Sequence, residues 1–503
     1  MNLGGKSYEL STSMRNNQSV ILKKPQPATI NIMVQIRMHG WKKNGCSDWR
    51  CIDGFEMTDT LIRNIRLFIR GKLREANILI KSGQIEKISK VVSKIPYTGS
   101  LDRLVEGRGD LVLPSGIDVH VHFRGMGERM KEDWYTGSCA AAAGGITTVV
   151  DHPNTDPPVL GRRGFNRKLV DASSMSIIDF GLNGCARGEN IGRLSELWRI
   201  GVTSFGEIFM ADGRRLAVKG DDLGKALSEI NGLGAIACLH AEDDETNQKL
   251  KRKYEKNRDP HIHSIIRPPE SEEIAIKQAL LMGKKTKLHF CHISTKNAVN
   301  LIKKEKNIRE GLTCEVTPHH LLLSTSEYQR LGTYGKMNPP LRDPEHKSAL
   351  WNALNEKNID IIASDHAPHT IEEKETNIHD APPGVPGVET LIPLMLTAAK
   401  QGKISIGRLI ETTRLNPAKR FKLEPHGKGN LEAGSDADLI IIDTQNPKTI
   451  RGEELYSKAT WTPFEGMKGI FPRITMLRGK IIWDDGPAVK KGYGNFLPGA
   501  GAI

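Results

Sequence analysis

Residues 118–124 have the sequence Asp118-Val119-His120-Val121-His122-Phe123-Arg124 and follow the apolar run Leu111-Val112-Leu113. The pattern predicts a β-strand, and residues i and i+2 of a strand project to the same side. His120 and His122 therefore present two imidazoles together, which allows both to bind one metal ion. Arg124 continues on that face with a planar guanidinium group that suits a carboxylate. An edge strand with solvated histidines would explain the His-x-His pattern equally well. The choice between this interpretation and a metal site depends on the rest of the chain.

The central part of the chain alternates predicted strands with predicted helices. The strands are 117–122, 146–151, 177–182, 202–209, 235–240, 287–292, 312–316 and 359–364, and the helices between them include 134–143, 189–198, 271–282 and 296–304. Eight strands that alternate with helices indicate an α/β protein with a (β/α)8 TIM-type barrel. The active sites of such barrels lie at the C-terminal ends of the strands.

Histidines and carboxylates occupy several of these strand ends. Besides the first strand, they are Asp151-His152 after the second, Glu207 in the fourth, His240 in the fifth, His292 in the sixth and Asp365 in the eighth. Four histidines and two carboxylates are what two zinc ions bridged by a carboxylate require. Each residue alone is more simply a structural one, but together they predict a binuclear metal site.

Composition excludes several classes of protein. The chain has 503 residues, of which 38% are hydrophobic and 26% charged, so it can form a barrel and an accessory domain. The net charge of +13 is dispersed and no nucleic-acid-binding motif is present, so we expect no nucleic-acid partner. No apolar run is long enough for a membrane span, and no signal peptide is evident. Seven scattered cysteines predict reduced thiols and a cytoplasmic location.

The two ends of the chain differ from its centre. Residues 1–56 are polar and contain eight Lys/Arg against four acids, which predicts a disordered extension or a start codon assigned upstream of Met57. Residues 57–113 and 421–503 are short alternating stretches separated by glycine turns, the pattern of antiparallel strands. We therefore expect one β-sandwich built from both ends, flanking a barrel over 114–420.

From about Asp59 onward the sequence resembles the class I dihydroorotases of the amidohydrolase superfamily. The matching segments are residues 118–124, Pro153-Asn154-Thr155, 291–295 (Cys-His-Ile-Ser-Thr), 317–320 (Thr-Pro-His-His), 338–342 (Asn-Pro-Pro-Leu-Arg), 364–369 (Ser-Asp-His-Ala-Pro-His) and 384–390 (Gly-Val-Pro-Gly-Val-Glu-Thr). By this resemblance the metal ligands are His120, His122, His240, His292 and Asp365. The implied substrate contacts are Arg124, Asn154, Asn338 and His369, with the backbone of Pro383 and Gly384.

Glu207 is a departure from the resemblance. Related cyclic amidohydrolases often carry a carboxylated lysine on the fourth strand, which bridges the two metals, and other class I enzymes use a nearby aspartate. Glutamate already has a carboxylate, although on a shorter arm. We expect Glu207 to bridge two Zn²⁺ ions directly, or else only one metal to be bound tightly; an ion-paired strand acid is the structural alternative.

The resemblance implies a reaction and its partners. It implies reversible closure of N-carbamoyl-L-aspartate to dihydroorotate in pyrimidine biosynthesis, with Asp365 carrying the proton between water and the ring nitrogen. A homodimer and an association with aspartate transcarbamoylase are further expectations, and residues 370–389 are a predicted mobile lid. Hydantoinase or allantoinase activity, a catalytically inactive scaffold and a basic nucleic-acid binder are the alternatives.

The remaining histidines have structural interpretations. His289, His319 and His320 adjoin the matching segments and are expected to orient metal ligands. Five further histidines lie in polar, loop-like contexts and are expected to be solvated: His261, His263, His346, His379 and His426.

Overall fold

Two parallel sheets form the centre of the chain in the computed structural model, which describes residues 59–90, 101–211 and 217–502. The first contains β5 (Gly116–Val121), β6 (Ile146–Asp151) and β7 (Asp179–Leu182). The second has the order β12-β11-β10-β9-β8, made of β8 (Phe205–Phe209), β9 (Ile236–His240), β10 (Lys287–Phe290), β11 (Thr313–Val316) and β12 (Ile361–Ile362). Each of these eight strands overlaps a predicted one, so the mixed α/β class is confirmed.

Isolated parallel bridges connect the margins of the two sheets. Gly184, just after β7, pairs with Phe205 at the start of β8. At the other margin Val121 of β5 pairs with His366, which follows β12. The strand ends that carry the predicted ligands therefore belong to neighbouring strands.

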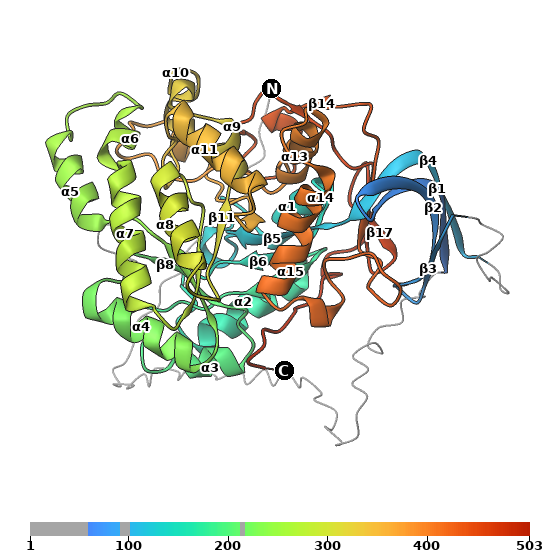
Figure 1. The fold of residues 1–503 in the computed structure, drawn as a ribbon, viewed down its shortest axis with the longest axis horizontal. Coiled ribbons are helices and arrows are strands. Elements are labelled where there is room, and N and C mark those ends of the chain that lie inside the picture. The colour runs from blue at the N-terminus through green and yellow to red at the C-terminus, as the bar shows by residue number, and fades with distance from the viewer. Residues whose placement is uncertain (1–58, 91–100, 212–216, 503) are drawn as a thin grey trace, which may run out of the picture. The chain divides into compact units, whose positions relative to one another are not determined.

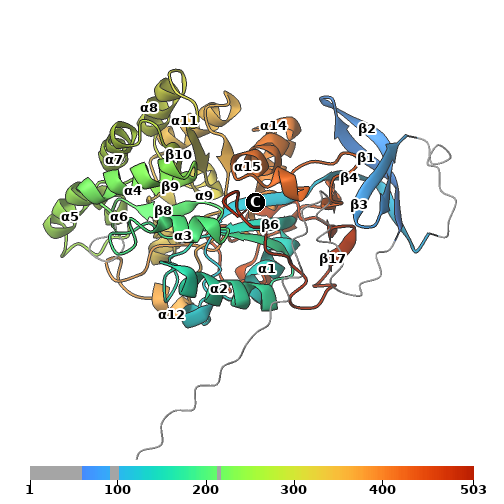
Figure 2. The same ribbon diagram turned by 90° about the horizontal axis from the view of Figure 1, so that it is seen from below.

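Helices lie outside the parallel strands and separate them along the chain (Figures 1 and 2). They are α1 (Trp134–Ala143), α2 (Arg162–Met175), α3 (Leu194–Arg199), α4 (Gly220–Gly232), α5 (Asp244–Lys253), α6 (Ile262–Ile266), α7 (Pro269–Met282), α8 (Lys296–Lys306), α9 (Pro318–Leu322), α10 (Tyr328–Leu331), α11 (Pro344–Asn355), α12 (Ile371–Lys374), α13 (Leu391–Lys400), α14 (Ile406–Ile410) and α15 (Asn416–Arg420). Among the described residues, none of the helices is long and apolar enough to cross a membrane.

Local side chains explain where two of these helices begin. Asp133 caps α1 by accepting hydrogen bonds from the amides of Tyr135 and Thr136. The predicted helix at 189–198 is wrong in its first half, because α3 begins only at Leu194. The side chain of Asn190 bonds to backbone groups of Arg187, Leu160 and Cys185, and these bonds favour a turn over a helix.

Both ends of the described chain contribute to one seven-stranded sheet of order β17-β16-β13-β4-β1-β2-β3. Its strands are β1 (Thr60–Ile69), β2 (Lys72–Lys81), β3 (Gln84–Ser89), β4 (Arg103–Pro114), β13 (Leu439–Ile442), β16 (Ile474–Leu477) and β17 (Lys480–Asp484). Figure 1 shows blue β1–β4 beside red β17. A separate two-stranded sheet pairs β14 (Lys448–Thr449) with β15 (Lys468–Gly469).

The predicted sandwich takes the form of one curled sheet. The amide of Ile85 in β3 donates to the carbonyl of Ser435, and the amide of Ala437 donates to the carbonyl of Gly83. Residues just ahead of β13 thereby return to β3, at the far edge of the sheet. The curl encloses an apolar core that includes Ile62, Ile78 and Ile441, so a second sheet is not needed to cover that face.

A buried ion network joins this sheet to the parallel strands. The ammonium group of Lys428 lies 2.7 Å from Asp179 of β7 and 2.8 Å from Asp438, which precedes β13. Arg478, in the β16–β17 turn, pairs with the other oxygen of Asp179. The predicted extension over residues 1–56 lies outside the described residues.

Candidate active site

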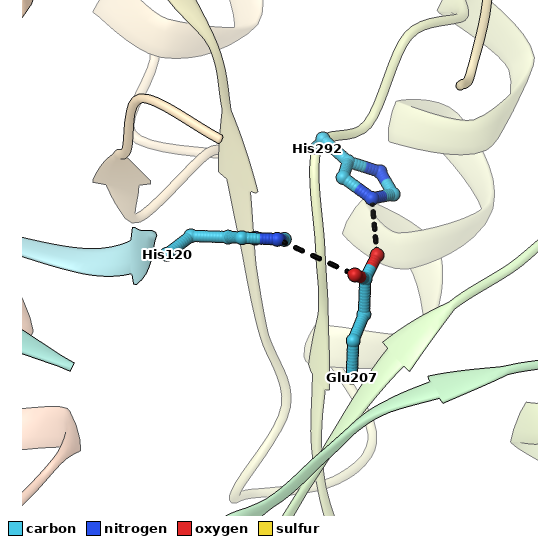
Figure 3. A group of neighbouring side chains, drawn as sticks. All are labelled: His120, Glu207 and His292. Atoms are coloured by element: carbon cyan, nitrogen blue, oxygen red, sulfur yellow. Dashed lines mark hydrogen bonds and ion pairs between the residues drawn. The ribbon is translucent and has the colours of Figure 1, made fainter. Parts of the chain in front are cut away.

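The carboxylate of Glu207 lies between two pairs of histidines. Its Oε1 is 2.6 Å from Nε2 of His292 and 2.9 Å from Nδ1 of His240. Its Oε2 is 3.5 Å from Nε2 of His120 and 3.7 Å from Nε2 of His122. Figure 3 shows one carboxylate oxygen directed toward His120 and the other toward His292. Within the described residues no lysine or arginine pairs with Glu207, and its ion-pair partners are the four histidines.

Asp365 completes the half of the cluster that contains the first two histidines. Its Oδ1 lies 3.4 Å from Nε2 of His120 and 3.2 Å from Nε2 of His122. All six predicted ligands are therefore in one buried cluster, although they come from five strands and their following loops. The Nε2 atom of His120, which faces Glu207 and Asp365, is buried and has no hydrogen-bond partner.

These donor atoms fit divalent metal ions. Four donors at about 2.0–2.2 Å from a tetrahedral zinc ion stand roughly 3.3–3.5 Å apart. The separations of 3.2–3.7 Å among the nitrogens of His120 and His122 and the oxygens of Glu207 and Asp365 match that spacing. His240, His292 and Glu207 are closer together, at hydrogen-bonding distance. Glu207 offers one oxygen to each group, which is what a bridging carboxylate does.

The electrostatics of the cluster favour a cation. Burial lowers the pKa of His240, but Glu207 and Glu242 outweigh it and raise that pKa to about 9. Burial would raise the pKa of Asp365, yet the positive charge of His120 and the hydrogen bond from His122 hold it well below its usual range. The negative charge of these buried carboxylates stabilises the protonated, positively charged histidines, and it would stabilise a bound metal cation in the same way.

Other polar residues orient three of the four histidines. Nδ1 of His120 is 2.5 Å from Glu315 in β11, and Nδ1 of His122 is 2.8 Å from Oδ1 of Asn154. Nε2 of His240 is 2.8 Å from Glu242. Such contacts fix which ring nitrogen is available to a metal.

Sequence reasoning missed Glu315 and Glu242. Glu315 is buried and also lies 3.0 Å from His289, while Glu242 is held by Arg267 through a bond of 3.0 Å from Nε. A signal existed for Glu315, because it is an acid inside the apolar strand Thr313–Val316, as Glu207 is in β8. Cys291, His120 and Glu315 also place donor atoms within 4.8 Å of one another.

Replacing Glu315 with glutamine should weaken metal binding without unfolding the protein. The amide keeps the shape but removes the charge that orients His120, and loss of such a partner costs about 10- to 100-fold in metal affinity. Titration of metal-depleted protein with Zn²⁺ measures this change. Glu272→Gln is the control, since Glu272 is also buried but bonds Ser294 and Thr295 instead of a ligand. Equal affinity in the wild type and in Glu315→Gln would contradict the role given to Glu315.

A cavity of about 310 Å³ opens beside the cluster. This volume is sufficient for a small molecule. All six predicted substrate contacts line it, together with four of the six candidate ligands: Arg124, Asn154, Asn338, His369, Pro383, Gly384, His122, Glu207, His240 and Asp365. The structure therefore places the predicted binding residues around one space.

Arg124 is a buried cation in the wall of that cavity. Its NH2 atom lies 3.3 Å from Nε2 of His369 and 3.5 Å from the carbonyl oxygen of Pro368, and its Nε has no partner. In the part of the chain that the structure describes, no carboxylate forms an ion pair with it. A buried guanidinium without a counter-charge is costly, so the cavity favours an anionic ligand.

Three residues of the candidate site have a strained backbone conformation. Arg124, His292 and Asp365 have φ angles of 51°, 29° and 48°, in a region that residues with a side chain rarely adopt. Each lies two or three residues after a parallel strand, since β5 ends at Val121, β10 at Phe290 and β12 at Ile362. A strained backbone conformation is retained where contacts with the surrounding structure hold it in place, which is common at functional sites.

The remaining histidines are mostly buried. His289 contacts Glu315, and His320 lies between Thr317 and the carbonyl oxygen of Pro339, so both hold neighbouring groups in place. His152 does not line the cavity, but its ring is 4.1 Å from that of His120. The prediction that His263 is solvated is wrong: its side chain is buried and its Nε2 lies 2.9 Å from the carbonyl oxygen of Met337.

The sequence profile of the Amidohydrolase family matches residues 111–482, a span that contains every candidate ligand. The chain belongs to the amidohydrolase family.

Within the amidohydrolase family, the chain groups with archaeal sequences named dihydroorotase. It is 49% identical to the dihydroorotase of Methanosarcina acetivorans over 455 residues, which cover 88% of this chain and 96% of the relative. The dihydroorotase of Halobacterium salinarum is 42% identical over 417 residues, covering 81% and 95%. Similarity of this extent supports the resemblance inferred from the motifs.

Solved amidohydrolase structures with the same fold carry other names. L-hydantoinase (dihydropyrimidinase) from Arthrobacter aurescens has a TM-score of 0.83 and 32% identity, covering 88% of this chain and all of that one. Dihydropyrimidinase from Brevibacillus agri has a TM-score of 0.81 and 26% identity, covering 87% and 98%. The fold is therefore shared with enzymes of different name, so the substrate has to be inferred from the residues that line the cavity.

Proposed function

We propose that this chain is a dihydroorotase, which interconverts N-carbamoyl-L-aspartate with (S)-dihydroorotate and water in pyrimidine (UMP) biosynthesis. The observation that carries the assignment is Arg124, a buried guanidinium in the cavity beside the histidine–carboxylate cluster, with which no carboxylate of the described residues forms an ion pair. Dihydroorotate has a ring carboxylate that would supply this charge. The name of the archaeal relatives supports the same activity.

Different cavity residues would bind different groups of this substrate. Arg124 would bind the carboxylate through charge-assisted hydrogen bonds. Asn154 keeps its Oδ1 on His122, so its amide nitrogen remains to donate to the substrate. Asn338, His369 and the backbone of Pro383 and Gly384 would complete the carboxylate-binding side of the cavity.

We propose two zinc ions, held by His120, His122, His240, His292 and Asp365 and bridged by Glu207. When bound, such ions polarise an amide carbonyl and acidify a water molecule. The choice of Zn²⁺ rests on the nitrogen-rich donor set and on the spacing described above.

Asp365 is the proposed general base and acid. The neighbouring histidines keep its pKa below the usual range, so it is a carboxylate when it receives the proton of the attacking water. In the ring-opening direction it then passes this proton to the departing ring nitrogen, and in the ring-closing direction the sequence is reversed. Asp365 directly precedes His366, which pairs with Val121, so its carboxylate lies near the C-terminal end of β5.

The architecture that supports this site is proposed to be a closed (β/α)8 barrel over residues 114–420. The eight strands and the two bridges at their margins support closure. The parts assigned to 57–113 and 421–503 would form the flanking β-domain. A homodimer, an association with aspartate transcarbamoylase and a cytoplasmic location stay predictions.

Two alternatives make different demands on the site. A hydantoinase or allantoinase acts on a neutral ring and has no use for a buried guanidinium. An inactive scaffold has no need for a complete ligand set, yet all six candidate ligands are within one cluster. Both are therefore less well supported than dihydroorotase.

One experiment tests the assignment. Metal content of the purified protein is measured, together with turnover of dihydroorotate, N-carbamoyl-L-aspartate, hydantoin and allantoin. We expect bound zinc and turnover of the first two compounds alone. Faster turnover of hydantoin or allantoin than of dihydroorotate would overturn the substrate assignment, and metal-free protein with full activity would overturn the metal site.

A further inference from the structure

Lys374 is a fully buried lysine behind the wall of the cavity. It is the last residue of α12, and its side chain has no exposed surface. Across residues 59–90, 101–211 and 217–502, no carboxylate forms an ion pair with it. Its ammonium group instead donates to three backbone carbonyls, at 3.0 Å to Lys336, 3.0 Å to Pro382 and 3.1 Å to Gly384. All three donor positions of the amine are thereby used.

These carbonyls belong to two segments that form one wall of the cavity. The first, residues 336–338, carries Asn338, and the second, residues 382–384, carries Pro383 and Gly384. A backbone bond of 3.0 Å from the amide of Gly384 to the carbonyl of Lys336 also joins them. Lys374 therefore holds three of the six candidate substrate contacts from behind.

The wall has little freedom to rearrange at Gly384. Its φ of 138° is favourable only for glycine, and a Cβ there would be 2.4 Å from the carbonyl oxygen of Ala367. The carbonyl of Pro383 lies 3.2 Å from Nε2 of His369. A shift of residues 382–384 would consequently displace His369, which contacts Arg124.

We infer that Lys374 is a positioning residue, which sets the distance of Asn338, Pro383 and Gly384 from the substrate by tying residues 336–338 to 382–384. Lys374 touches neither the metal ligands nor the cavity. Its effect falls on substrate binding and not on the chemistry at Asp365. The inference rests on the proposed function only for the identity of the substrate.

Lys336 supplies a matched control. Its ammonium group is also buried and donates to carbonyls of the same loop, at 2.5 Å to Ile378 and 3.1 Å to His379. Burial lowers the pKa of both lysines to about 7. Ile378 and His379 do not line the cavity, so removal of the Lys336 amine costs a similar set of bonds but keeps the bonds by which Lys374 joins residues 336–338 to 382–384.

The test compares Lys374→Met with Lys336→Met. In Lys374→Met we expect the KM for dihydroorotate to rise about 10- to 100-fold, since a displacement on the order of 1 Å at a binding residue has effects of this size. We expect kcat to change less than threefold and zinc content to be unchanged. Lys336→Met should lower the melting temperature to a similar extent but raise the KM at least threefold less than Lys374→Met does.

Hydrogen exchange provides a readout that needs no substrate. The peptide that spans residues 380–390 should exchange faster in Lys374→Met than in Lys336→Met, because the Gly384 amide loses its fixed acceptor. If Lys374→Met does not fold, Lys374→Gln, which retains two donors, replaces it and should show a smaller change of the same sign.

Two results would overturn the inference. One is an unchanged KM and unchanged exchange in the Lys374 variants. The other is an equal rise in KM in Lys336→Met, which would mean that the loop merely needs its buried amines for stability. Wild-type protein that is inactive on dihydroorotate would instead contradict the proposed function, while the exchange comparison would still test the role of Lys374.

Discussion

Glu207→Gln is expected to lose at least one of the two proposed zinc ions and to reduce turnover by about 10³-fold or more. The glutamine side chain has nearly the same shape, but it offers one neutral oxygen where Glu207 offers two charged ones, to His240 and His292 on one side and to His120 and His122 on the other. Metal ions supply several kcal/mol of charge stabilisation, and each 1.36 kcal/mol corresponds to about tenfold in rate. Metal analysis and an assay on dihydroorotate measure both effects.

Glu272→Gln again serves as the control for this experiment. Glu272 is as buried as Glu207, and its partners are the hydroxyl groups of Ser294 and Thr295. We expect this variant to retain two zinc ions and nearly all of the activity. If Glu207→Gln kept two zinc ions and full activity, Glu207 would not be a bridging ligand. A single tightly bound zinc in the wild type would support the other expectation from the sequence, that only one metal is bound tightly.

Arg124→Met is expected to reduce kcat/KM for dihydroorotate by about 10²- to 10⁴-fold with metal content unchanged. The methionine leaves the substrate carboxylate buried without its partner, and breaking such a pair costs roughly 3–5 kcal/mol. The cost falls on substrate binding because Arg124 contacts His369 and Pro368 and not the candidate ligands. Steady-state kinetics with both dihydroorotate and N-carbamoyl-L-aspartate test the expectation.

Arg124→Lys separates charge from geometry. Lysine keeps the positive charge but loses the planar fork, so we expect activity between that of Arg124→Met and that of the wild type. Unchanged dihydroorotate kinetics in Arg124→Met would remove the basis of the substrate assignment even if the metal site stood. Loss of zinc in proportion to activity in Arg124→Met would also remove the basis of the substrate assignment, because Arg124 would then act through the metal ligands.

Local sequence determined the parallel strands and most of the candidate ligands. Strands of a covered parallel sheet are buried on both faces, so they appear as apolar runs such as residues 236–239, and their positions can be predicted without tertiary information. The two-residue repeat of strands likewise placed His120 and His122 on one side. The resemblance of short segments, and not spacing alone, supplied the roles of Asn154, Asn338 and His369.

Only the tertiary structure decided which groups orient the ligands and the cavity wall. Glu315 contacts His120 across 195 residues of sequence, and no local periodicity encodes such a distance. Lys374 has the sequence context of an exposed lysine, in a run of glutamates, and its burial depends on three carbonyls that two other segments of the chain supply. His263 was misjudged for the same reason. A polar side chain is buried when distant backbone groups satisfy its hydrogen bonds, and those groups become neighbours only in the folded chain.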